Sequence, residues 1–207
     1  MIRTFLCAVA FSAAALSASA ATITNGDFET GDLSGWSVGS TANGETAYSG
    51  VDAFDTGGNG ASDAASFRIG QIDFDPGVNE GITLSQTISI MSAGTYSFAA
   101  EVAVFGGRFT NLSGGIFELI VGGNVLDVFD AARVNSRSTE RDLLEGEVAL
   151  AVGDVDLTIR IMRPFIQTSD TPLQYVDNVT ISPVPLPAGL PLLAFGLGSL
   201  ALVRRKS

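Results

Sequence analysis

Short runs that alternate apolar and polar residues constrain the fold of this chain more than any other feature. Between Gly81 and Ile90 the apolar residues fall at nearly every second position, and after the turn Met91–Gly94 the alternation continues to Val104. A period of two places successive side chains on opposite faces of a β-strand, whereas an amphipathic helix has a period of 3.6. The second run would bury one face, made of Tyr96, Phe98, Ala100, Val102 and Val104.

Similar runs recur about every eight to twelve residues and are separated by glycine, asparagine and aspartate, a pattern typical of a β-sandwich. We expect Gly81–Ile90 and Thr95–Val104 to be antiparallel strands joined by Met91–Gly94. Two further hairpins are expected, and Leu173–Ile181 would be the closing strand. The hairpins are Ile116–Val121 with Val125–Phe129 around Gly122-Gly123-Asn124, and Glu147–Val152 with Val155–Met162 around Gly153-Asp154.

Helical periodicity is weak in this part of the chain. The polar segment Arg133–Glu147 is the nearest candidate, and we predict one helical turn at Arg141–Leu144.

Both ends of the chain carry targeting signals. Residues 1–20 predict a signal peptide, with the small residues Ala18 and Ala20 at its cleavage site, so the protein should be exported. Leu186–Val203 has no charge and is about long enough to cross a bilayer as a helix. Cations directly after a span stay in the cytoplasm, so the three that follow would form a membrane stop and orient the rest outward, namely Arg204, Arg205 and Lys206. The expected domains are therefore the signal peptide 1–20, an ectodomain 21–182 and a tail 183–207.

The entrance to this tail resembles the PEP-CTERM family of bacterial sorting tails, in the variant that reads Val-Pro-Leu-Pro-Ala. The matching residues are Val184, Pro185, Leu186, Pro187 and Ala188. The resemblance implies an exosortase-type membrane enzyme that cuts near the motif and then releases or transfers the ectodomain. It also implies a setting rich in exopolysaccharide. A plain C-terminal anchor is the alternative.

Composition excludes several functions. The only cysteine, Cys7, lies in the signal peptide, and the chain has no histidine, so Ser-His-Asp and Cys-His nucleophiles are ruled out. All 22 acidic residues but only seven of the 11 basic ones fall in the ectodomain. Such a surface repels nucleic acid and suits a neutral glycan, a divalent cation or a basic partner.

The ectodomain itself resembles galactose-binding-like jelly rolls, the fold of many carbohydrate-binding modules. The resemblance rests on the opening segment Asn25–Trp36 and on Tyr175-Val176-Asp177-Asn178-Val179 near the end. It implies an all-β, single jelly-roll sandwich. It also implies a structural calcium ion that ties the first segment to the last strand, with Glu29 and Asp177 at the matching positions and Asp27 next. Turn capping or pairing with arginine is the alternative for these acids.

Two further features allow two interpretations each. Trp36 would pack in the core, or its indole would stack on a sugar ring. The acidic segment Asp52–Asp63 superficially resembles an EF-hand, but it lacks the acidic residue required at the third position, so we interpret it as a flexible loop.

Catalysis would need a pair of carboxylates. Glu101, Glu118 and Asp156, which lie in otherwise apolar strands, are the candidates, but we interpret them as outward positions on half-solvated strands. We therefore expect a non-catalytic display or adhesion module at the cell surface or in the extracellular matrix, with exopolysaccharide as its ligand. A structural matrix protein without a specific ligand and a carboxylate-dependent glycan hydrolase are the alternatives.

Overall fold

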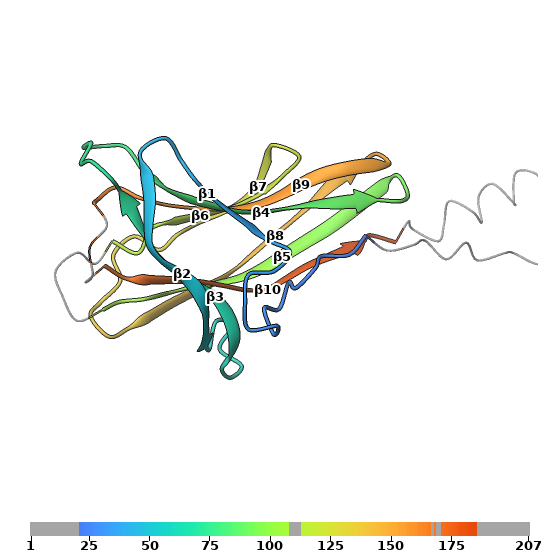
Figure 1. Cartoon of the computed structure of the whole chain (residues 1–207). Helices are drawn as coiled ribbons and strands as arrows, with labels where there is room; N and C mark the ends of the chain where they lie inside the picture. Colours follow the sequence, from blue (N-terminus) through green and yellow to red (C-terminus); the bar gives the residue numbers. More distant parts are fainter. Residues whose placement is uncertain (1–20, 108–112, 167, 169–170, 186–207) are drawn as a thin grey trace, which may run out of the picture.

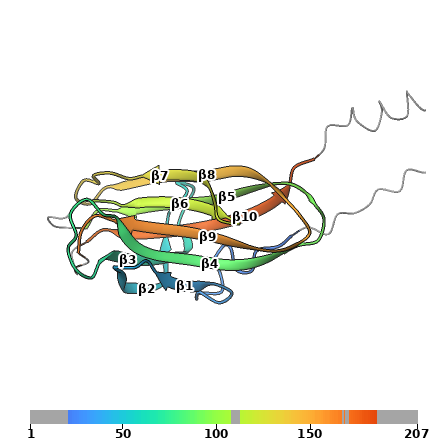
Figure 2. The ribbon, with the colours of Figure 1, turned by 90° about the horizontal axis from the view of Figure 1, so that it is seen from above.

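The computed structural model describes residues 21–107, 113–166, 168 and 171–185. These residues form two five-stranded antiparallel sheets packed face to face, as Figures 1 and 2 show. The first sheet has the order β1 (Ser37–Ser40), β4 (Glu80–Ile90), β9 (Gly153–Arg163), β6 (Ile116–Val121) and β7 (Asn124–Asp130). The second has the order β2 (Gly44–Phe54), β3 (Ser62–Gln71), β10 (Leu173–Pro183), β5 (Gly94–Phe105) and β8 (Thr139–Leu150). The all-β, two-sheet prediction is confirmed.

The core lies between the sheets and follows the alternation in the sequence. The expected buried face of β5 is confirmed, because its five members are at most 3% exposed. In β4 the inward positions are Ile82, Leu84, Ile88 and Ile90. Burying each such side chain stabilises the fold by roughly 1.5–3 kcal/mol, so this alternation fixes which face of each sheet points inward.

Two of the three predicted hairpins are wrong as pairs, although their strands exist. β4 belongs to the first sheet and β5 to the second, so the turn between them crosses the sandwich; the same holds for β8 and β9. β4 pairs instead with β9, and β5 with β8 and β10. A short turn can lead either to the same sheet or to the opposite one, and alternation does not distinguish the two. The β6–β7 hairpin is confirmed, with positive φ at Gly122 and Gly123.

The predicted helical turn at Arg141–Leu144 is also wrong. These residues belong to β8, which pairs with β5 along its whole length. β8 is an edge strand, and Leu144 is its only fully buried residue. Its polar sequence therefore reflects an exposed edge and not a helix.

The sandwich has two distinct ends. At one end, here called the tail end, the described chain begins at Ala21 and stops at Pro185, and the β4–β5 and β8–β9 turns lie there as well (Figure 1). At the other, the far end, lie the connections β3–β4 and β9–β10. The fold continues directly into the expected sorting motif, because the Val184 amide donates to the Thr95 carbonyl oxygen at 2.9 Å.

The other targeting residues lie outside the described part of the chain. They are the signal-peptide residues Ala18 and Ala20, the rest of the motif at Leu186, Pro187 and Ala188, and the cations Arg204, Arg205 and Lys206. Among the residues with described positions, no helix could span a bilayer.

Candidate functional site

The strand register of the second sheet defines a face that points away from the core. Asp177 lies opposite Glu101, Tyr175 opposite Ala103, and Glu101 opposite Leu143 on β8. Residues directly opposite one another in antiparallel strands project to the same side. The pairing of β10 with β3 and of β3 with β2 extends this face across the sheet, and we call it the outer face. Its side chains are those of Tyr48, Asp52, Phe54, Ser62, Ala64, Ser66, Arg68, Glu101, Ala103, Phe105, Arg141, Leu143, Tyr175 and Asp177.

Aromatic rings form the middle of this outer face. Phe54 stacks on Tyr175 with ring centroids 3.8 Å apart and planes within 4°, and Phe105 is tilted against Phe54 at 6.3 Å. Ala64 and Ala103 pack beside Tyr175, so no large side chain displaces the rings. Burial raises the pKa of Tyr175 to about 12. The half-buried rings of Phe54 and Phe105 form the apolar floor of the face.

A polar network borders the rings on β2 and β3. The Tyr48 hydroxyl and the Ser66 hydroxyl both donate to Asp52 Oδ2, at 2.8 and 2.7 Å. The bond to Asp52 raises the pKa of Tyr48, because the carboxylate stabilises the protonated phenol. Arg68 Nε is buried and has no hydrogen-bond partner within the described chain. The face thus combines apolar surface with both donors and acceptors.

The β2–β3 loop, residues 55–61, is tied across this face to β8. Arg141 Nε donates to the Asp55 carbonyl oxygen at 2.8 Å, and its Nη2 lies 3.3 Å from Asp55 Oδ2. The loop backbone passes directly over the Glu101 carboxylate, since a Cβ added to Gly57 would lie 2.4 Å from Glu101 Oε2. The loop interpretation of Asp52–Asp63 holds only for residues 55–61, because its two ends belong to β2 and β3, and the attachment of the loop to β8 is a feature that the sequence did not predict.

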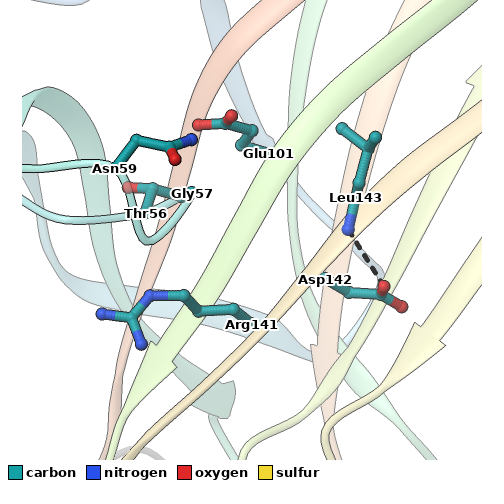
Figure 3. Close-up of a pocket in the computed structure, with 7 residues that line it drawn as sticks. All are labelled: Thr56, Gly57, Asn59, Glu101, Arg141, Asp142 and Leu143. Carbon is teal, nitrogen blue, oxygen red and sulfur yellow. Dashed lines mark hydrogen bonds between the residues drawn. The ribbon is translucent and has the colours of Figure 1, made fainter.

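A pocket of about 350 Å³ lies between this loop and strands β5 and β8 (Figure 3). The side chains of Asn59 and Glu101 point toward one another there, and Arg141 lies on the other side of the loop. Thr56 Oγ1 is buried and has no hydrogen-bond partner in the described structure. Amide, hydroxyl and carboxylate groups therefore line the pocket next to an aliphatic wall. Its lining is Thr56, Gly57, Asn59, Glu101, Arg141, Asp142 and Leu143.

Asp177, one of the expected calcium ligands, is a buried carboxylate beside this pocket. Its Oδ2 accepts from the Ser62 hydroxyl and its Oδ1 from the Asn178 amide, both at 2.7 Å. Burial raises the pKa of Asp177, and the nearby charges of Glu101 and Glu29 raise it further. The side-chain amide of Asn178 donates to Glu101 Oε2 at 2.9 Å, which links the two strands.

The other two expected ligands lie on the N-terminal segment. Glu29 Oε1 accepts from the Asp63 amide at 3.2 Å, so Glu29 does bind the segment to β3. Asp27 instead lines a separate pocket of about 380 Å³ along β10. Within the described residues no three His, Cys, Asp or Glu side chains come close enough to hold a metal ion. A calcium ion at Glu29 and Asp177 would need main-chain or hydroxyl oxygens as additional ligands.

Trp36 is packed against the sandwich. It is 8% exposed, its ring centroid lies 5.7 Å from that of Phe28, and its Nε1 donates to the Asn25 carbonyl oxygen at 2.9 Å. This burial favours the packing interpretation over stacking on a sugar.

The three acids considered for catalysis do not come together. Glu118 accepts from Arg160 Nε at 2.6 Å and Asp156 accepts from the Thr87 hydroxyl at 2.7 Å, both on the first sheet. Glu101 belongs to the second sheet, on the other side of the core.

Comparison with known proteins adds a likeness of fold. No protein-family model and no curated protein matches the chain. Among solved structures, the enzymatically active domain of tailspike protein 4 from bacteriophage CBA120 aligns with a TM-score of 0.51 and 11% identity, over 79% of this chain and 21% of that one. TmCBM61 in complex with β-1,4-galactotriose aligns with a TM-score of 0.49 and 16% identity, over 77% and 96%. The CBM22-1 xylan-binding domain of Paenibacillus barcinonensis Xyn10C aligns with a TM-score of 0.42 and 13% identity, over 78% and 93%.

Proposed function

We propose that this chain is an exported, non-catalytic glycan-binding module that acts at the cell surface or in the extracellular matrix. The observation that supports the proposal is the outer face, where an apolar aromatic floor adjoins a pocket roofed by the β2–β3 loop. Sugars present both apolar C–H faces and hydroxyl groups. A site for them therefore needs aromatic surface together with a few fixed polar groups, as small-molecule sites generally do.

The charges of the pocket favour a neutral glycan. Glu101 and Asp142 line it with carboxylates, and the guanidinium that lines it, Arg141, is already paired with Asp55. A polyuronate would bring further negative charge to this face and would be repelled. Neutral exopolysaccharide is therefore the proposed ligand.

Affinity electrophoresis of the full-length chain through gels that contain neutral galactan, xylan or β-glucan tests the proposal, with alginate as the anionic comparison. We expect retardation by at least one neutral polymer and none by alginate. Lost hydrogen bonds to a charged group cost about 1.5–3 kcal/mol, so Glu101→Gln should weaken binding about tenfold or more. Asn59→Ala should also weaken it.

The matched control is Asp156→Asn, which changes a carboxylate on the opposite sheet and should leave the affinity within about twofold. Unchanged binding in Glu101→Gln and Asn59→Ala would place the ligand elsewhere. No retardation by any polymer would favour the structural matrix protein, and release of reducing ends would favour a hydrolase.

We also propose that calcium binds between Glu29 and Asp177. The supporting observation is a buried carboxylate with two acidic neighbours, which takes part in neither of the two ion pairs of the described residues. A divalent cation would offset this repulsion and join the N-terminal segment to β10. Saturating calcium at about 100 times its Kd contributes roughly 2.7 kcal/mol, which should raise Tm by roughly 5–10 °C.

Differential scanning calorimetry of the full-length chain with calcium and then with a chelator measures this shift. Glu29→Gln should abolish it, while Asp156→Asn, on the opposite sheet, should preserve it. An identical Tm with calcium and with chelator would refute the calcium site.

Export and exosortase-type processing at Val184–Ala188 complete the proposal and rest on the sequence motif. The intact mass of the protein from membrane and extracellular fractions tests them. A species that ends near Pro185 is expected outside the cells, and a full-length tail found only in membranes would identify a plain anchor.

A further inference from the structure

A second exposed apolar surface lies at the far end, away from both the outer face and the tail. Five side chains from the β3–β4 and β9–β10 connections form it, and we call it the far-end patch: Ile72, Phe74, Val78, Phe165 and Ile166. They are 37–53% exposed, and Phe74 is the most exposed of them. Contiguous apolar side chains on a soluble surface mark interaction sites more often than isolated ones do.

The patch is held rigidly by hydrogen bonds from two amides. The side chain of Gln71 donates to the carbonyl oxygens of Asp75 and Val78 and accepts from the Asp75 amide. The Gln71 main-chain amide donates to the Phe165 carbonyl oxygen at 2.9 Å, which joins the two connections. Asn43 binds both the amide and the carbonyl oxygen of Asp73. The exposed rings are thus presented on a fixed loop, and binding would not have to order it.

The two aromatic rings of the patch share one orientation. The rings of Phe74 and Phe165 are parallel within 1°, with centroids 6.2 Å apart. Each remains more than a third exposed despite this contact. The pair therefore offers an aromatic surface that the described residues leave open to solvent.

The polar groups around the patch distinguish between ligands. Both N–H groups of the Gln71 side chain and one of the two of Asn43 are used inside the loop, so these amides offer few donors to a ligand. Asp73 and Asp75 are exposed, and their hydrogen bonds to other described residues use main-chain atoms, so within the described chain both carboxylates face solvent. A glycan needs donors as well as acceptors, whereas apolar side chains flanked by lysine or arginine complement this surface in both respects. A second copy would place like charges opposite one another across a two-fold interface.

We propose that the far-end patch binds a partner protein through a segment of apolar residues flanked by basic ones. The patch lies at the end opposite to Pro185 (Figure 1), so it stays accessible when the chain is held by its C-terminus. This proposal does not depend on glycan binding at the outer face.

Panning a phage-displayed library of random peptides against the full-length chain tests it. We expect enrichment of peptides that combine leucine, phenylalanine or tryptophan with lysine or arginine. A synthetic peptide from the enriched set should bind at least tenfold more weakly to Phe74→Ser and to Phe165→Ser. Its binding should also weaken several-fold between 50 and about 500 mM NaCl.

Met91→Ser is the matched control, because Met91 is 59% exposed at the tail end. This variant should bind like the wild type. Since Phe74 is mainly exposed, the Tm of Phe74→Ser should be nearly unchanged, so lost binding would not reflect unfolding. Absence of enrichment, selection of peptides without basic residues, or binding to both patch variants as tight as to the wild type would overturn the proposal. So would oligosaccharide binding that Phe74→Ser abolishes.

Discussion

Replacement of Gly81 by alanine is expected to cost about 3 kcal/mol or more, which lowers Tm by roughly 6–12 °C. An added Cβ would lie 2.1 Å from the Ile161 carbonyl oxygen and 2.8 Å from Ile69 Cδ1. The first contact is with main chain of the paired strand β9, which cannot rotate away as a side chain can. From the other side, Gly44 approaches so closely that its own Cβ would lie 1.9 Å from the Gly81 carbonyl oxygen. The start of β2 therefore crosses β4 where only glycine fits at both positions.

Gly94→Ala is the matched control for this prediction. Gly94 begins β5, and nothing lies within 4 Å of the place where its Cβ would be. We expect this variant to unfold within about 0.5 kcal/mol of the wild type in urea, since it touches no neighbour. A wild-type Tm for Gly81→Ala would contradict the close approach of these segments, and equal losses in both variants would point to a cause other than the clash.

Arg163→Met should be the second strongly destabilising change, at about 2–5 kcal/mol. Arg163 is fully buried at the end of β9, where its Nε donates to the Ser113 carbonyl oxygen at 2.7 Å and its Nη1 to the Ile69 carbonyl oxygen at 2.9 Å. Burial lowers its pKa to about 10, so it still carries its charge at neutral pH. Methionine would leave two carbonyl oxygens without this donor, and each unsatisfied group costs about 1–3 kcal/mol.

Arg160→Met, three positions earlier on the same strand, separates the loss of these bonds from the loss of an arginine. Arg160 pairs with Glu118 and its side chain is 35% exposed, so its removal should cost at most about 1 kcal/mol. Urea denaturation at neutral pH compares the two variants. Equal stability of Arg163→Met and the wild type would mean that the cost of burying this cation equals the stabilisation by its hydrogen bonds. Its Nη2, which has no hydrogen-bond partner among the described residues, adds to that cost.

The sequence predicts the strands of this protein better than their partners. Alternation identifies β4, β5 and the buried face of β5 because burial acts on each strand separately. Pairing depends on which sheet a short turn leads to, and the turns of two or three residues after β4 and β8 carry no signal that indicates this. Only the first half of β8 is missed, for a related reason: from Thr139 to Leu143 no residue is buried, so this edge segment shows no apolar alternation.

The sequence likewise points to single residues of the candidate site but not to the residues that they meet. It singles out Glu29 and Asp177 because they belong to recognisable segments at the two ends of the ectodomain. Asn59, Arg141 and Leu143 are not, because they meet only through the register of β5 with β8 and through the Asp55–Arg141 ion pair. Glu101 is noticed as an acid in an apolar strand, but its place beneath the loop depends on strands far apart in the sequence.

The bond between Val184 and Thr95 has a mechanical consequence. β10 lies between β3 and β5 and runs lengthwise from the far end to the tail end, and the chain leaves it without a spacer. A pull on the C-terminus would therefore act along β10. Antiparallel hydrogen bonds lie across the strand direction, so such a load would shear the ladders on both sides at once instead of opening them one bond at a time. Under the proposed function, β10 is the strand that would carry tension between a bound glycan and the attachment point at the C-terminus.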